Sequence, residues 1–281
     1  MTAASATAAS GTAAPEPVGR DALAGTFADA DVVAAYRSRP PYPAEVFDVL
    51  ASLICGQPRD VLDIGAGDGA LARPLAAIAD HIDAVDISAA MLRAGARQPG
   101  GQRPNLRWIL GAIETAELSG PYALVTAGAS LHWMDPEVTM ARLAQVMMSG
   151  AVLAVVEHGP EGTPWGDDVA AVIRRHSRSP DYVPALSWPD KLAGLGLLRI
   201  TGRATTVPVV FRQSLAQFVE HLHSTSALAR KWMTRDEAAA FRAGVIAAVG
   251  PHADNGELAM PVVARITWGT PSASPDGARD D

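Results

Sequence analysis

The stretch Asp63-Ile64-Gly65-Ala66-Gly67-Asp68-Gly69 decides the fold of this chain. Val61 and Leu62 precede it as a short apolar strand, and residues 70–79 follow it with apolar side chains at helical spacing. The unit is therefore predicted as a strand, a glycine-rich turn and a helix. Glycines in such a turn let the backbone approach a ligand closely, and the helix N-terminus behind them favours negatively charged groups.

A second strand is predicted at residues 82–85, and it ends in Asp86, 23 residues beyond Asp63. A carboxylate at the tip of the second parallel strand of such a unit accepts hydrogen bonds from both hydroxyls of a ribose. The glycine turn and Asp86 together indicate a site for a nucleoside-containing cofactor.

The identity of this cofactor depends on Asp63, because Gly65-x-Gly67-x-x-Ala70 also satisfies the loose dinucleotide fingerprint. A dinucleotide site usually keeps the strand before the first glycine apolar, so that a pyrophosphate docks nearby. S-adenosylmethionine carries an ammonium and a sulfonium and no phosphate, so a carboxylate there suits it. The segment resembles motif I of the class I S-adenosylmethionine-dependent methyltransferases, and Asp86 stands where that family keeps its ribose-binding acid.

The resemblance continues into the next predicted strand. The family carries its adenine contacts on a strand followed by Gly-Asp-Ala-Glu, and here residues 106–110 are followed by Gly111-Ala112-Ile113-Glu114. Ala112 replaces the acid that usually accepts the adenine amino group, which leaves the backbone at Ile113 to read the ring.

Two further segments resemble one branch of the family. The predicted strand 123–127 runs into Gly128-Ala129-Ser130-Leu131-His132-Trp133, which is similar to the small-molecule branch that includes the aconitate methyltransferases. Upstream, Tyr36-Arg37-Ser38-Arg39-Pro40-Pro41-Tyr42-Pro43 resembles a segment of the same branch. The resemblance covers roughly residues 24–268.

This resemblance and the carboxyl-edge positions give the candidate site residues. The candidate cofactor contacts are Tyr36, Arg39, Asp63, Gly65, Ala66, Gly67, Asp86, Ile87, Met91, Ala112, Ile113, Glu114 and Ala127. The candidate catalytic residue is His132, just beyond the fourth strand, where active sites of this family open. The candidate substrate contacts are Trp133, His158 and His223. No metal is expected, because no cluster of acidic residues follows the fourth strand.

Several candidates also have an ordinary structural interpretation. His132 is either a general base or substrate contact, or a structural histidine packed beside the adjacent tryptophan. Glu157 and His158 are expected to end the fifth strand at the edge where ligands bind, or to form a solvated strand terminus. Tyr36 suits a cation–π contact with a sulfonium and Arg39 suits a carboxylate, or their segment simply fixes an extended backbone.

The composition excludes several classes of protein. A net charge of −7 and a pI near 5.5 argue against a nucleic-acid surface, which needs clustered positive charge. Cys55 is the only cysteine, which excludes an intrachain disulfide. No apolar run approaches the ~20 residues of a membrane span. The N-terminus also lacks the features of a secretory signal, so we expect a cytoplasmic protein without membrane contact.

One α/β domain is predicted at residues 21–269, between two tails. Residues 1–20 and 270–281 are small and polar, and we expect them to be disordered because they bury too little apolar surface. Strand–helix alternation between the tails implies a doubly wound, seven-stranded, mostly parallel sheet of the Rossmann-like methyltransferase type.

A helical lid is predicted over the carboxyl edge of this sheet. Ser214-x-x-Gln217 and Thr234-x-x-Glu237 are capping-box patterns that open two helices before the last strand. We expect this region, at about residues 212–256, and residues 21–55 to enclose the substrate.

Three functions compete at this stage. The leading hypothesis is a methyltransferase acting on an oxygen, a carbon or a carboxylate of a small organic molecule. The second is a protein of the same fold that binds S-adenosylmethionine without methyl transfer, and the replacement at Ala112 gives it some support. The third is an NAD-dependent oxidoreductase, which lacks an evident hydride-transfer constellation here. The sequence determines neither the substrate nor whether the chain forms a homodimer.

Overall fold

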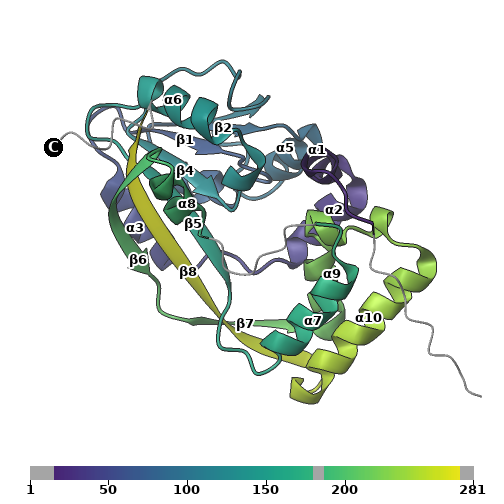
Figure 1. The fold of residues 1–281 in the computed structure, drawn as a ribbon. Helices are drawn as coiled ribbons and strands as arrows, with labels where there is room; N and C mark the ends of the chain where they lie inside the picture. The colour runs from purple at the N-terminus through teal and green to yellow at the C-terminus, as the bar shows by residue number, and fades with distance from the viewer. Residues whose placement is uncertain (1–15, 180–186, 273–281) are drawn as a thin grey trace, which may run out of the picture.

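An eight-stranded sheet forms the centre of the computed structural model, which describes residues 16–179 and 187–272 (Figure 1). The strands are β1 (Asp60–Ile64), β2 (His81–Asp86), β3 (Leu106–Leu110), β4 (Leu124–Gly128), β5 (Leu153–Pro160), β6 (Leu198–Thr205), β7 (Val209–Ser214) and β8 (Glu257–Pro271). Their order is β3-β2-β1-β4-β5-β8-β6, and β7 also pairs with β8. β1 to β5 run parallel, whereas β8 is antiparallel to its neighbours β5, β6 and β7.

The predicted seven-stranded, mostly parallel sheet is confirmed, except that β6 and β7 together occupy the position of one strand beside β8. β6 pairs with residues 265–271 of β8, and β7 pairs with residues 257–262. The chain leaves regular strand structure between them, at residues 206–208, where Pro208 has no N–H to donate to a ladder.

Helices cover both faces of the parallel half of the sheet. α3 (Glu45–Leu53) and α4 (Ala72–Leu75) cover one face, and α6 (Pro136–Val146) and α8 (Trp188–Gly194) cover the other. Along β1, Val61 packs towards the first pair, whereas Leu62 and Ile64 pack towards the second. Burial on both faces explains the continuous apolar character of these strands. α4 is shorter than the helix predicted at residues 70–79, because turns flank it on both sides.

The strand order reverses at β1, which pairs with β2 on one side and with β4 on the other. In open parallel sheets, ligands bind outside the carboxyl ends of the strands at such a switch point. The carboxyl ends of β1 and β4 therefore locate the candidate site.

Three helices form a second layer at the far end of β8, and we call them the cap (Figure 1). They are α7 (Gly166–His176), α9 (Leu215–His223) and α10 (Arg235–Val249). The cap packs on β7 and the first half of β8 around its own apolar cluster, which includes Phe218, Phe241 and Leu258. Both predicted capping boxes are present, at Ser214 and Thr234.

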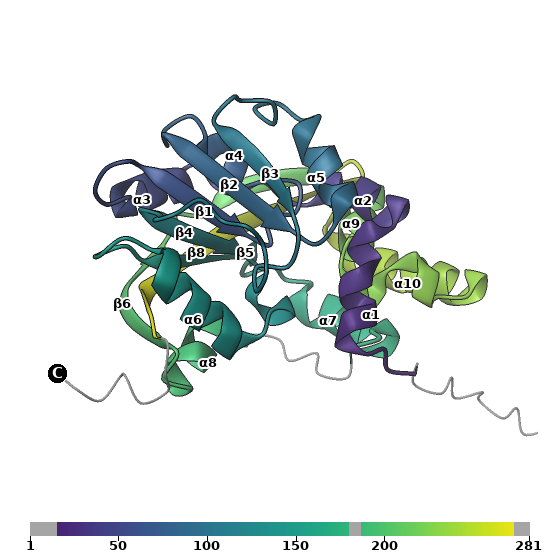
Figure 2. The same cartoon turned by 90° about the horizontal axis from the view of Figure 1, so that it is seen from above.

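The N-terminal segment connects the cap to the sheet (Figure 2). α1 (Arg20–Ala24) begins this segment, α2 (Ala30–Ala35) contacts α5 (Ala89–Ala96) and α9, and the helical turn η2 (Tyr36–Ser38) contacts α9. The Ser88 hydroxyl at the start of α5 donates to the Phe27 carbonyl at 2.7 Å. Lys231, beyond α9, pairs with Asp29 at 2.9 Å. The short helical turns are η1 (Gly25–Ala28), η3 (Leu131–Trp133), η4 (Ser226–Leu228), η5 (Arg230–Trp232) and η6 (Gly250–His252).

The predicted tails fall mostly outside the described residues, at 1–15 and 273–281. Within the described part, the Val18 N–H donates to the Arg178 carbonyl at 2.8 Å. β8 continues to Pro271, two residues into the segment predicted as disordered, because these residues pair with β6. In the described ranges no helix combines the length and apolarity needed to cross a membrane.

The capping boxes generate a test of cap stability. Ser214→Ala and Thr234→Ala each remove an oxygen that accepts a helix-opening N–H, so each is expected to lower the free energy of unfolding by about 0.5–2 kcal/mol. Urea unfolding measures this loss. Ser52→Ala is the matched control, because its exposed hydroxyl bonds only the Val49 carbonyl within α3. Loss of stability equal to that of Ser52→Ala would show that the boxes do not stabilise the cap.

Candidate functional site

Two cavities meet at the glycine turn between β1 and α4. One has a volume of about 430 Å³ and contains Asp86, and the other has about 360 Å³ and contains Asp63. We call them the Asp86 cavity and the Asp63 cavity. The residues lining both are Tyr36, Gly65, Gly67, Gly128 and Ala129. The place where the two cavities meet, which we call the join, therefore lies at the carboxyl ends of β1 and β4, at the topological switch point.

The glycine turn needs all three of its glycines, and Gly69 at its end has a φ of +77°. Gly65 and Gly67 have φ values of +63° and +57°, in the left-handed region that side chains other than glycine rarely adopt. A Cβ at Gly65 would collide with Ser130. A Cβ at Gly67 would meet only the Tyr36 ring, at 4.0 Å, and would otherwise enter open space. Gly67 is thus the point where backbone is most exposed to a ligand.

Asp86 fixes this turn and remains available to a ligand. Its Oδ2 accepts the Gly67 N–H at 2.8 Å, and its Oδ1 accepts the Ser88 N–H at 2.7 Å. Burial raises the pKa of Asp86, and these two N–H groups oppose the rise. A carboxylate has about four acceptor positions, so two are left for hydroxyl donors in the cavity.

The Asp86 cavity collects most of the cofactor residues predicted from the sequence. Its lining includes Asp86, Ile87, Met91, Ala112, Ile113, Glu114 and, among the substrate candidates, Trp133. Ile87 is 54% exposed, an apolar side chain at the cavity surface. The Glu114 carboxylate accepts the Asp135 N–H at 2.9 Å, which holds the loop after β3 against the loop after β4. The cavity thus combines the Asp86 carboxylate with apolar lining residues such as Ile87 and Met91.

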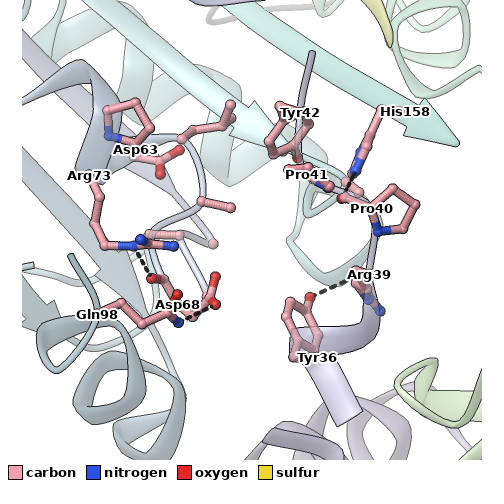
Figure 3. A pocket seen from close by; sticks show the side chains of 18 of the residues that line it. Tyr36, Arg39, Pro40, Pro41, Tyr42, Asp63, Asp68, Arg73, Gln98 and His158 are labelled. Atoms are coloured by element: carbon pink, nitrogen blue, oxygen red, sulfur yellow. Dashed lines mark hydrogen bonds between the residues drawn. The ribbon is translucent and has the colours of Figure 1, made fainter. Parts of the chain in front are cut away.

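The Asp63 cavity has a buried carboxyl group at its base. Asp63 is 1% exposed, and its Oδ1 accepts the Thr126 hydroxyl at 2.8 Å. Burial raises the pKa of Asp63 to about 7, against the lowering effect of Thr126 and the Ala72 backbone. Figure 3 shows Asp63 across the cavity from the Tyr36 and Arg39 side chains. A cationic group in the cavity would stabilise the ionised form of this acid.

Arg39 connects the cavity wall to the cap. Its guanidinium lies 3.8 Å from the centre of the Tyr36 ring and donates to the Tyr36 hydroxyl at 2.9 Å. It also donates to the Ser224 hydroxyl at 2.8 Å and to the Ser224 carbonyl at 3.0 Å, at the end of α9. Three of its five N–H donors are therefore engaged.

His158 lies within β5 rather than at the end of the strand. β5 extends to Pro160 because it pairs along its whole length with the long β8, so the expectation that Glu157 and His158 end the strand is wrong. His158 Nε2 bonds the Pro40 carbonyl at 2.9 Å, and its ring lies 4.0 Å from the Tyr42 ring (Figure 3). It still lines the Asp63 cavity, as its candidate role requires.

His132, in η3, lies beside the aromatic rings of Trp133 and Trp188. Its ring is 4.5 Å from that of Trp133 and 6.3 Å from that of Trp188. Burial, aided by the Arg39 charge, lowers the pKa of His132 to about 4. His132 lines neither cavity and has no hydrogen bond among the described residues. A neutral imidazole is thus present at neutral pH, but nothing orients it as a base.

Two candidates lie away from both cavities. His223 is buried in the cap, where its Nδ1 donates to the Leu228 carbonyl at 2.8 Å and its ring packs on Phe241. It follows Val219 by one helical turn and so belongs to the core face of α9. Ala127 is buried in β4, one residue before the glycine that reaches the cavities.

His221, which is absent from the predicted site, lies close enough to Arg39 for the arginine charge to act on it. Burial and the Arg39 charge lower the pKa of His221 to about 3, and His158 also contributes. Tyr42 is similarly close to the join, since a Cβ on Gly128 would lie 2.5 Å from its hydroxyl. In residues 16–179 and 187–272, no group of three or more His, Cys, Asp or Glu side chains is placed to hold a metal ion.

Comparisons with known proteins find matches to the part of the chain that carries the glycine turn. Residues 61–150 match the family model described as a methyltransferase domain. Uncharacterized methyltransferases of Mycobacterium bovis and Mycobacterium tuberculosis are 40% identical over 98 residues, which is 34% of this chain and 49% of the relative. The chain thus spans about half the length of the curated relatives it matches.

Solved structures share the fold over most of the chain. A candidate type II methyltransferase from Anaeromyxobacter dehalogenans is 24% identical, with a TM-score of 0.60 over 83% of this chain and 97% of that one. A phosphoethanolamine N-methyltransferase of Haemonchus contortus, in complex with phosphomonomethylethanolamine and S-adenosylhomocysteine, is 16% identical, with a TM-score of 0.50 over 90% of this chain and 60% of that one. The fold is therefore Rossmann-like and of the methyltransferase type.

The Arg39 contacts generate a test of how the N-terminal segment is held. Arg39→Ala removes three hydrogen bonds from a charged donor, each worth about 1.5–3 kcal/mol, so exchange of amides in residues 20–44 is expected to rise by at least about tenfold. Hydrogen–deuterium exchange measures this, and β1 to β5 should keep their protection.

Arg37→Ala is the matched control for this experiment, because Arg37 is exposed and makes no hydrogen bond among the described residues. Equal exchange in the two variants would show that Arg39 does not hold the segment.

Proposed function

We propose that this chain is an S-adenosylmethionine-dependent methyltransferase that acts on an oxygen, a carbon or a carboxylate of a small organic molecule. The observation that carries the proposal is the pair of cavities joined at the glycine turn, each with one carboxyl group. Asp86 would accept the ribose hydroxyls in one cavity, and Asp63 would face the ammonium group in the other. Bound S-adenosylmethionine supplies the methyl group.

The residues present fit this cofactor better than a dinucleotide. The Gly67 N–H, which a dinucleotide site would direct at a phosphate, already donates to the Asp86 carboxylate. Asp63, Asp68 and Asp86 surround the turn with acids, and acids oppose a diphosphate but attract an ammonium or a sulfonium. The open space at Gly67 leaves room for a ligand across the join.

The comparisons support the same proposal. The methyltransferase-domain match lies on residues 61–150, which contain the turn, Asp86 and the loops after β3 and β4. One structure with this fold holds S-adenosylhomocysteine, the product that methyl transfer leaves. The finer similarity to the aconitate-type branch, carried by residues 36–43 and 128–133, remains part of the proposal.

On the acceptor side, we propose substrate contact for Trp133 and His158, which line the cavities. His132, the candidate base predicted from the sequence, packs beside Trp133. Residues 21–55 and the cap helices α9 and α10 act as a lid in this proposal, and the Arg39 contacts with Ser224 hold it closed. Closure excludes water and fixes the acceptor in line with the methyl group, which supplies much of the acceleration in such a displacement.

Turnover with a panel of acceptors tests the function. The protein is incubated with S-adenosylmethionine and with small alcohols, amines, carbon acids and carboxylates, and S-adenosylhomocysteine is detected by mass spectrometry. We expect product with at least one class and background without acceptor. Binding of the cofactor without product from any acceptor would instead support the same-fold binding protein. Preference for NADH would support the oxidoreductase.

Asp86→Ala is expected to weaken S-adenosylmethionine binding by about ten- to a hundredfold, because hydrogen bonds to a charged group are worth about 1.5–3 kcal/mol. Calorimetric titration measures the dissociation constant. Asp80→Ala is the matched control, since Asp80 also accepts a backbone N–H, from Arg59 at 2.8 Å, but at the opposite end of β2. An unchanged dissociation constant in Asp86→Ala would remove this residue from the site.

The pKa of Asp63, raised to about 7 by burial, predicts pH-dependent binding. A bound ammonium lowers the pKa of Asp63, so below about pH 7 the acid must first lose a proton, and affinity should fall by up to about tenfold per pH unit. Titrations between pH 6 and pH 8 measure the slope. Asp63→Asn should bind more weakly and lack this slope. Wild-type affinity that is constant over this range would contradict a contact between Asp63 and the ammonium.

A further inference from the structure

The protonation of His158 is fixed by its backbone contact. Nε2 lies 2.9 Å from the Pro40 carbonyl oxygen, which only accepts hydrogen bonds, so Nε2 carries the hydrogen. Burial lowers the pKa of His158 and the Arg39 charge adds to this effect, against the raising effect of the Pro40 hydrogen bond. The imidazole is therefore neutral at neutral pH, and its other nitrogen, Nδ1, carries a lone pair.

This lone pair has no hydrogen-bond partner among residues 16–179 and 187–272. Nδ1 of His158 is buried and bonds to no other described residue. Buried polar atoms are nearly always paired in native proteins, and an unpaired one is a candidate for ligand contact. His158 lines the Asp63 cavity. A hydrogen-bond donor that reaches Nδ1 from this cavity would satisfy the atom.

The groups around His158 suit an acceptor that loses a proton. The Tyr42 ring packs on the imidazole at 4.0 Å, the charge of Arg39, just after η2, acts on it, and His158 in turn lowers the pKa of His221 on α9. Glu157, the neighbour on β5, bonds the Trp188 backbone on the other side of the sheet. Arg39 keeps two unused N–H donors, so negative charge that develops on an oxygen beside His158 meets a positive group.

We propose that His158 is the general base of this site and that the methyl acceptor is a hydroxyl group. The inference rests on the proposed function and identifies its acceptor class. The hydroxyl proton passes to Nδ1 while the O–CH₃ bond forms. The S–CH₃ bond breaks, its electron pair stays on sulfur, and S-adenosylhomocysteine results. Nδ1 then returns the proton to solvent. The Pro40 carbonyl orients the base, as a third group does in a catalytic triad.

His158→Gln tests the assignment while keeping the Pro40 contact, because the glutamine amide also donates a hydrogen bond but is not basic. Turnover with a hydroxyl acceptor is expected to fall by about 10²–10⁴-fold, with unchanged affinity for S-adenosylmethionine. The wild-type rate should decline as the pH falls and His158 becomes protonated, and the variant should lack this decline. His252→Gln, at an exposed histidine of η6 beyond α10, is the control for unchanged activity.

His132→Gln separates the two candidate bases. This variant should keep the wild-type fall in turnover rate at low pH, even if the substitution changes the overall rate. The proposal is overturned if His132→Gln loses that decline, if His158→Gln turns over at the wild-type rate, or if only carboxylates or amines are methylated.

A measurement without turnover separates this proposal from the proposed function. ¹⁵N nuclear magnetic resonance of histidine-labelled protein at pH 7, with His158→Gln for assignment, should show a protonated Nε2 and a bare Nδ1. A protonated Nδ1 would overturn the assignment even if methyl transfer occurs. A wild type that methylates no acceptor would overturn the proposed function, while the nitrogen shifts would still decide the state of His158.

Discussion

The hydrogen bond from the Gly67 N–H to the Asp86 carboxylate, 2.8 Å long, is the contact on which the site depends. It joins the turn after β1 to the tip of β2, so two strands that pair only through their backbones are also locked at their carboxyl ends. Gly67 keeps a positive φ there, and its missing Cβ leaves the join of the two cavities open. A longer or branched residue at either position would close the join or release the turn.

β8 is the second constraint, because it belongs to two layers at once. Its second half pairs with β5 and β6 in the main sheet, and its first half pairs with β7 beneath the cap. The cap has its own apolar cluster, centred on residues such as Phe241, and so does not depend on the packing of β1 to β4. Polar contacts of Arg39 and Lys231 then connect the cap to the N-terminal segment. This arrangement places a separately packed layer beside the ligand site.

Local features of the sequence were sufficient to predict the part of the candidate site around the glycine turn. The turn at 63–69 and the tip of β2 at Asp86 follow from residues that are adjacent along the chain, and the cavities form where these residues predict. The same holds for α9 and α10, whose capping boxes are local.

Features that depend on distant pairing were missed. β5 extends past His158 only because β8 is long, and no residue near 158 signals this. α7 was not predicted, since its exposed face is strongly polar and Val169 is its only fully buried residue. His223 was preferred to His221, although its spacing from Val219 places it on the core face of α9. The bond between His158 and the Pro40 carbonyl joins residues 118 positions apart, and sequence patterns carry no trace of it.

At each titratable group around the join, burial disfavours the charged form. Asp63 is held near half protonation at neutral pH, and the pKa values of His132, His158 and His221 all lie below the ordinary range, so these imidazoles are neutral. The free site thus keeps its imidazoles neutral and Asp63 only partly ionised, with Arg39 among the guanidinium groups that line the Asp63 cavity. A cationic ligand ionises the acid, and a hydroxyl ligand gives its proton to a base. The charges needed for the reaction would then arise only with both ligands in place, in a cavity from which the lid excludes water.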